Sequence, residues 1–129
     1  MKNPTLLIAA LAGLIGVAGC AGDSVDDRPP SFKLIVATVF TPSCATASCH
    51  STLAHAADIV LDDPKKAYDR LTDPTDALVD VTSQHDPDAS ELVEWIQGER
   101  DLRMPPDMPL AQADIDLIRA WIAAGAENN

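Results

Sequence analysis

Residues 104–126 read MPPDMPLAQADIDLIRAWIAAGA. The proline-rich first part of this segment cannot form a helix, whereas the second part favours one. Pro105, Pro106 and Pro109 exclude a helix from the first part, because proline lacks the N–H donor and restricts the residue before it. The second part predicts a helix that ends near Gly125, since glycine commonly follows the last helical turn. Its apolar residues recur at helical spacing: Ile115, Ile118 and Ile122 on one stripe, with Leu117 and Trp121 beside it.

Two more helices are predicted upstream from their start and stop signals. LDDPKKAYDRLTD, residues 61–73, has Asp62 or Asp63 as its cap and Pro64 in the first turn, where a missing N–H costs little. HDPDASELVEWIQG, residues 85–98, repeats the order of capping aspartate, proline and closing glycine with Asp86, Pro87 and Gly98. The sequence therefore predicts a mainly α fold with long loops.

The segment SFKLIVATVF, residues 31–40, fits both a helix and a strand. Ser31 is placed to cap a helix. The apolar residues fall near one helical face: Phe32, Ile35, Val36, Val39 and Phe40. The β-branched content suits a strand equally well, so periodicity leaves both structures open here.

Two thiols and an imidazole stand together in CATASCH, residues 44–50. Four interpretations of Cys44, Cys49 and His50 are open: a disulfide, a zinc site that needs a fourth ligand, a copper site completed by a methionine, and covalent haem attachment. Haem attachment explains the order best, because each thiol can add to one vinyl group and the next histidine then lies under the iron. The common spacing has two residues between the cysteines, whereas here there are four.

Both methionines after Met1 lie in the proline-rich loop, at Met104 and Met108. The ordinary role of a methionine is core packing. A thioether on a loop stiffened by prolines also suits the sixth position of a haem iron, where a soft neutral ligand raises the reduction potential. CATASCH and this loop together predict a site with one histidine and one methionine ligand.

The first 19 residues are typical of an export signal, with Lys2 followed by an apolar run, residues 6–18, that is short for a transmembrane helix. Val17-Ala18-Gly19-Cys20 resembles the lipobox of bacterial lipoproteins, in which the cysteine accepts the lipid. We therefore expect lipidation at Cys20 and a location in the bacterial cell envelope, facing the periplasm. By resemblance to such lipoproteins, alanine rather than aspartate after the lipid cysteine implies the outer membrane rather than the inner one.

The chain is strongly acidic, and this charge limits the classes of partner that it can bind. Nine Lys and Arg against twenty Asp and Glu give a formal charge of −11, and removal of the signal, whose one charge is Lys2, leaves −12. Such a surface is unsuited to nucleic acid, where cations must neutralise phosphates. We expect redox protein partners with basic patches, and a membrane contact through the lipid anchor.

From residue 34 to 126 the chain resembles small class I-like cytochrome c domains of the planctomycete and myxobacterial type. The resemblance rests on the Cys-Cys-His loop, on LDDPKKAYDRL, on DPDASELVEWI and most specifically on MPPDMPLAQADIDLIRAWIAAGA. It implies a cytochrome c-like helical fold with long loops around one haem c. It also implies thioether bonds from Cys44 and Cys49, with His50 as proximal and Met104 as distal iron ligand, Met108 being the backup.

These expectations define three segments: a lipoprotein signal peptide at 1–19, a flexible tether at 20–30 and a cytochrome c-like domain at 31–129. The expected function is that of a membrane-tethered monohaem c-type cytochrome, an electron carrier rather than a catalyst. Phe40, Leu102, Ile118, Trp121 and Ile122 are the residues expected to pack on the haem. The alternative is a haem-free lipoprotein interaction module of the same fold, closed by a Cys44–Cys49 disulfide.

Overall fold

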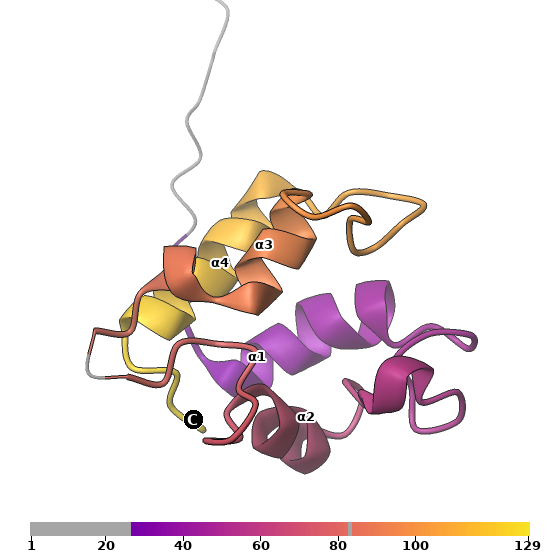
Figure 1. The fold of residues 1–129 in the computed structure, drawn as a ribbon, viewed down its shortest axis with the longest axis horizontal. Coiled ribbons are helices and arrows are strands. Elements are labelled where there is room, and N and C mark those ends of the chain that lie inside the picture. The colour runs from indigo at the N-terminus through magenta and orange to yellow at the C-terminus, as the bar shows by residue number, and fades with distance from the viewer. Residues whose placement is uncertain (1–26, 83) are drawn as a thin grey trace, which may run out of the picture.

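The computed structural model describes residues 27–82 and 84–129 (Figure 1). In chain order its elements are α1 (Phe32–Ile35), η1 (Val36–Cys44), η2 (Ala56–Asp58), α2 (Pro64–Leu71), η3 (Pro87–Ala89), α3 (Glu91–Gln97) and α4 (Gln112–Ala123). No strand occurs in these two stretches. The prediction of a mainly α fold with long loops is therefore confirmed.

The predicted export signal, the lipidation site at Cys20 and most of the predicted tether lie outside the described residues. In the part that is described, no helix is both long and apolar enough to cross a bilayer.

The helices are arranged in a small stack (Figure 1). Helices α3 and α4 pack against each other, α1 contacts α4, and α2 lies on the other side of α1 in this view. The loop between α3 and α4 and the segment after η1 extend toward the same end of the molecule. This end therefore receives both the Cys-Cys-His segment and the methionine loop.

The open question about residues 31–40 is decided in favour of a helix. Helix α1 continues without a break into η1, a π-helix that ends at Cys44. Its wider turns are closed by a hydrogen bond from the Ala45 N–H to the Phe40 carbonyl (2.8 Å), and Pro42, which has no N–H to donate, lies inside this stretch. The helix therefore carries the first cysteine at its end.

Four of the five aromatic side chains build one core cluster around Phe32. The Phe32 ring centroid lies 5.1 Å from that of Trp121, 5.2 Å from that of Tyr68 and 6.3 Å from that of Phe40. All five apolar residues of the predicted stripe on α4 are buried in the same core. A domain with few large side chains thus gathers them where α1, α2 and α4 meet, since aromatic rings bury the most area per residue.

The caps of α2 and α3 differ in how well the sequence predicted them. Asp63 caps α2, because its Oδ1 accepts from the N–H groups of Lys65 (3.0 Å) and Lys66 (3.1 Å). Asp86 does not cap α3 as expected: it caps the short turn η3, and α3 begins only after the buried Ser90. The predicted end of α3 is confirmed, with Gly98 in the left-handed region at φ 80°.

The last residue caps the first helix, a contact that the sequence analysis had assigned to Ser31. The Ser31 side chain makes no cap bond. Instead, the N–H of Phe32 donates to Asn129 Oδ1 (2.8 Å) and the N–H of Lys33 to the Asn129 carbonyl (3.0 Å). This pairing ties the two ends of the described domain together and satisfies two N–H groups that a helix start leaves open.

Candidate functional site

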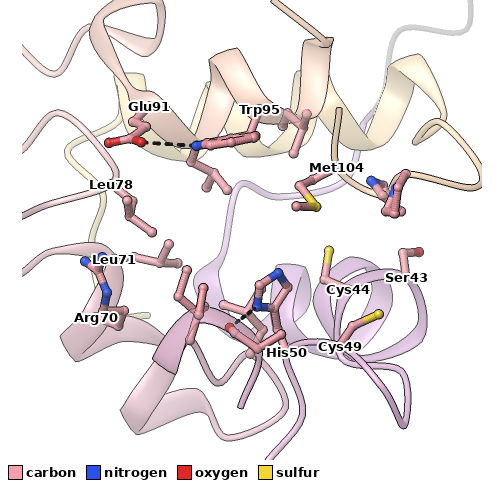
Figure 2. Close-up of a pocket in the computed structure, with 18 of the residues that line it drawn as sticks. Ser43, Cys44, Cys49, His50, Arg70, Leu71, Leu78, Glu91, Trp95 and Met104 are labelled. Atoms are coloured by element: carbon pink, nitrogen blue, oxygen red, sulfur yellow. Dashed lines mark hydrogen bonds between the residues drawn. The ribbon is translucent and has the colours of Figure 1, made fainter. Parts of the chain in front are cut away.

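A cavity of about 440 Å³ opens between α3 with its following loop on one side and α2 with the segment after η1 on the other (Figure 2). Its volume falls in the range of roughly 300–1,000 Å³ that holds small ligands and cofactors. Aliphatic side chains form most of the walls: Ile59, Leu61, Leu71, Leu78, Leu92 and Ile96. Such walls exclude water from whatever the cavity binds.

The cavity brings together four of the residues singled out in the sequence. Cys44, Cys49 and His50 lie on one side, and Met104 lies across from them (Figure 2). Met108 is not part of the lining, and its side chain is 71% exposed. The geometry therefore separates the two methionines of the loop, which the sequence alone ranked but did not place.

The four residues between the cysteines form a compact turn. The Cys49 N–H donates to the Thr46 carbonyl (3.0 Å), and the His50 N–H reaches back to the Cys44 carbonyl (3.1 Å). The middle of this turn, residues 46–48, is exposed. The extra length therefore bulges into solvent while both cysteines still line the cavity, and both are free thiols.

The His50 ring is held by the backbone that follows it. Its Nδ1 lies 2.9 Å from the Ala56 carbonyl oxygen, which can only accept a hydrogen bond. The proton of a neutral ring is thereby assigned to Nδ1, and the lone pair is left on Nε2, which points into the cavity (Figure 2). A backbone carbonyl on one ring nitrogen is the usual support of a histidine that ligates metal through the other.

Met104 is fixed at the end of α3 by its own backbone. Its N–H donates to the Trp95 carbonyl (2.9 Å), and the two prolines that follow also line the cavity. Proline restricts the backbone on both sides of each ring nitrogen, so the loop holds the thioether as a stiff arm. The Met104 sulfur faces the half of the cavity that contains the His50 ring (Figure 2).

Burial controls the chemistry of the first thiol. Desolvation raises the pKa of Cys44 to about 12, with the neighbouring Cys49 adding to the effect. A buried thiolate is disfavoured because its charge loses contact with water. In the haem-free chain Cys44 therefore stays a neutral thiol at physiological pH.

This leads to a first prediction for the haem-free protein. At pH 8 roughly one Cys44 in ten thousand is a thiolate, so iodoacetamide is expected to modify it on the order of a thousand-fold more slowly in the folded chain than in urea. Peptide mass spectrometry over time measures both rates. Equal rates in the folded and unfolded protein would contradict the burial of this thiol.

Within residues 27–82 and 84–129, no group of three or more His, Cys, Asp or Glu side chains is placed to hold a metal ion. The zinc interpretation of CATASCH requires such a group. What the cavity does bring together is a single imidazole and a thioether across an apolar space, and histidine with methionine is a donor pair that cytochromes use for a six-coordinate haem iron.

Comparison with known proteins yields one family match. Residues 47–108 match the family described as planctomycete cytochrome C. The chain carries a cytochrome c-like domain. No curated protein and no solved structure matches it. The matched segment contains Cys49, His50 and Met104, and this family indicates a haem-binding electron carrier.

The cavity walls of this cytochrome c-like domain differ from the haem-packing residues that the sequence predicted. None of the residues expected to pack on the haem lines the cavity. Phe40, Ile118, Trp121 and Ile122 are fully buried in the core, and Leu102 is 51% exposed. The reason is that α1 and α4 contact each other and bury their apolar residues in the core, so the cavity wall is left to α2, α3, the end of η1 and the loops.

The sequence analysis also missed three polar or aromatic residues of the lining: Arg70, Glu91 and Trp95. The Trp95 Nε1–H donates to Glu91 Oε1 (3.1 Å), and the Arg100 guanidinium lies 5.0 Å above the Trp95 ring. Trp95 is the one aromatic residue outside the core cluster, and no local signal distinguishes it from the others. Helical spacing puts Trp95 on one face with Leu92 and Ile96, but it does not indicate that this face lines a cavity.

The residues present fit a haem. Two thiols stand at one end of the cavity, a histidine presents Nε2 from one side, and a methionine presents its sulfur from the other. The remaining walls are mainly apolar, as a porphyrin requires. The fit depends on Cys44, Cys49, His50 and Met104, which all belong to backbone segments held by hydrogen bonds.

Proposed function

We propose that this chain is a membrane-tethered monohaem c-type cytochrome that carries single electrons between redox partners. The observation that carries the proposal is the meeting of Cys44, Cys49, His50 and Met104 at one apolar cavity. Haem c, when bound, supplies an iron that takes up and returns one electron at a time.

The side chains have distinct roles in this proposal. Cys44 and Cys49 would hold the porphyrin as thioethers, and His50 would ligate the iron through Nε2. Met104 would be the second protein ligand, and its thioether would raise the reduction potential. With both His50 and Met104 bound to the iron, no position would be left for a substrate, so the protein would act as a carrier rather than a catalyst.

The envelope location belongs to the same proposal. A lipid on Cys20 would tether the domain through residues 21–30 to a membrane facing the periplasm, with the outer membrane favoured by Ala21. The mature charge of −12 would attract basic surfaces on redox partners and repel nucleic acid.

The experiment is to express the full chain with a cytochrome c maturation system, denature it and stain the separated chain for haem. Covalently held haem is expected on the chain and is expected to disappear when Cys44 and Cys49 are both replaced by serine. Thr46→Ala, in the exposed part of the same turn and outside the cavity lining, is the matched control and should retain haem.

Mass spectrometry of the tryptic peptide that contains both cysteines completes the test. A mass increase equal to one haem supports the proposal. A peptide that carries only a Cys44–Cys49 cystine would overturn it and favour the haem-free interaction module.

A further inference from the structure

The end of the cavity away from the cysteines carries charge. Among the residues that line the cavity, Arg70 is the one cation and Glu91 the one carboxylate. Figure 2 shows both at the end opposite Cys44 and Cys49, with Arg70 coming from α2 and Glu91 from α3. A ligand fixed at the two thiols therefore directs its far edge toward these two side chains.

The Glu91 carboxylate is already engaged. Its Oε1 accepts from the Trp95 Nε1–H (3.1 Å) and lies 3.2 Å from Arg100 Nη1. Arg100 also pairs with Glu94 (2.8 Å). Glu91 is thus already engaged by Trp95 and by Arg100, which it shares with Glu94, and Arg70 is the lining cation that can meet a negative charge on a ligand.

Arg70 is oriented by an interaction that is easily exchanged. Its Nη1 donates to the Asp76 carbonyl oxygen (2.6 Å) and its Nη2 to Asp76 Oδ2 (3.1 Å). The Asp76 side chain is 76% exposed whereas that of Arg70 is 28% exposed, so water can replace the guanidinium at Asp76 at small cost. These two bonds use two of the five N–H donors of the guanidinium, and the others remain for a second acceptor.

We propose that Arg70 is the anchor for the carboxylate groups of the ligand, binding a haem propionate at the end of the cavity opposite the thioethers. This inference rests on the proposed function. In haem the propionates lie on the edge of the ring away from the vinyl carbons that the cysteines would hold. The guanidinium matches a carboxylate by paired, charge-assisted hydrogen bonds, which lysine does not reproduce.

Arg70 then acts as a positioning residue with two measurable effects. Its positive charge favours the reduced iron, which carries less positive charge, and so raises the reduction potential. It also keeps the propionate ionised by lowering the pKa of that group. The other charged groups around this end are Asp73 and Asp76 in the loop after α2, and Glu91 with Arg100 on the α3 side.

The test compares haem-loaded variants by redox titration across pH. Arg70→Gln is expected to retain haem and to shift the oxidation equilibrium about tenfold toward ferric iron, a fall of about 59 mV for one electron. It is also expected to show a pH-dependent step in the potential at higher pH than the unaltered protein, because the propionate loses its cation. Arg70→Met, which also removes the positive charge, is expected to show the same fall in potential and the same shift of the pH-dependent step.

Two controls separate this role from a structural one. Asp76→Ala breaks the same pair but keeps the guanidinium, so its potential and pH step should match those of the unaltered protein. Lys65→Gln removes an exposed charge from the same helix, where Lys65 pairs with Asp69, and should have little effect.

The outcomes are distinct. If the unaltered chain retains no haem, the proposed function and this inference fall together. If haem is retained but Arg70→Gln and Arg70→Met behave like Lys65→Gln, only the assignment of Arg70 is overturned. Failure of both Arg70 variants to load haem, with Asp76→Ala loading normally, supports the anchor, since only the guanidinium differs.

Discussion

Replacing Met104 by alanine is expected to lower the reduction potential of the haem-loaded protein while leaving the haem attached. The expected fall is on the order of 0.1 V or more, within the span of about 0.8 V over which axial ligands set haem potentials. A thioether favours ferrous iron, and its removal opens the distal position to water or another ligand. The thioether bonds at Cys44 and Cys49 do not involve Met104, so attachment is expected to survive. Redox titration and haem staining of the same sample measure both effects.

Met108→Ala is the matched control for this experiment. Met108 lies four residues further along the same loop, but it is outside the cavity lining and 71% exposed. Its replacement is expected to leave the potential unchanged. A fall in Met108→Ala with none in Met104→Ala would show that the loop rearranges on binding haem and that the other methionine is the ligand.

Replacing Trp121 by alanine is expected to lower the free energy of unfolding by about 3–5 kcal/mol, the usual loss when a large aromatic side chain is removed from a core. Trp121 is fully buried, its ring lies 5.1 Å from that of Phe32, and its Nε1–H donates to the Glu127 carbonyl (2.8 Å). The alanine leaves a void and an unpaired carbonyl together. Urea unfolding followed by circular dichroism measures the change, with all variants in the same state of haem loading.

Leu53→Ala is the control for the core, because the Leu53 side chain is 83% exposed in the loop after His50. Its effect on unfolding is expected to stay within about 0.5 kcal/mol, as for most surface substitutions. If Trp121→Ala also changes the free energy of unfolding by no more than about 0.5 kcal/mol, the aromatic cluster is not what stabilises the domain.

The elements that the sequence predicted well are those with local signals. Asp63 and Pro64 stand directly at the start of α2, and a cap acts within three residues of its own position. Gly98 and Gly125 end α3 and α4 with positive φ angles, which glycine adopts without strain. The stripe of α4 is likewise local, because its period is a property of the helix alone.

The elements that the sequence predicted less well depend on distant partners. Asp86 carries a good capping signal, yet it caps η3 and leaves the start of α3 to follow the buried Ser90. The segment of residues 31–40 is helical because Phe32 and its neighbours pack on α2 and α4, and propensity alone does not contain that contact. The cap from Asn129 spans almost the whole described domain, and no local pattern indicates it.

The candidate site also has a part that the sequence predicted and a part that it did not. Sequence order was enough to nominate Cys44, Cys49 and His50, because they are neighbours in the chain and their chemistry is a property of the residue types. The proline-rich loop nominated a methionine, and the resemblance ranked Met104 ahead of Met108. The walls of the cavity and the charged end at Arg70 were not predicted, since they come from α2 and α3 and meet only in the folded chain.

By itself the sequence determined the helices with local caps, the acidic charge and the set of side chains able to hold a haem. The tertiary structure alone decided that Met104 rather than Met108 faces His50, that the wide turn between the cysteines bulges outward, and that the apolar face of α4 serves the core. The physical reason is range: caps and helical periods act over a few residues, whereas a cavity exists only where segments far apart in the chain pack around it.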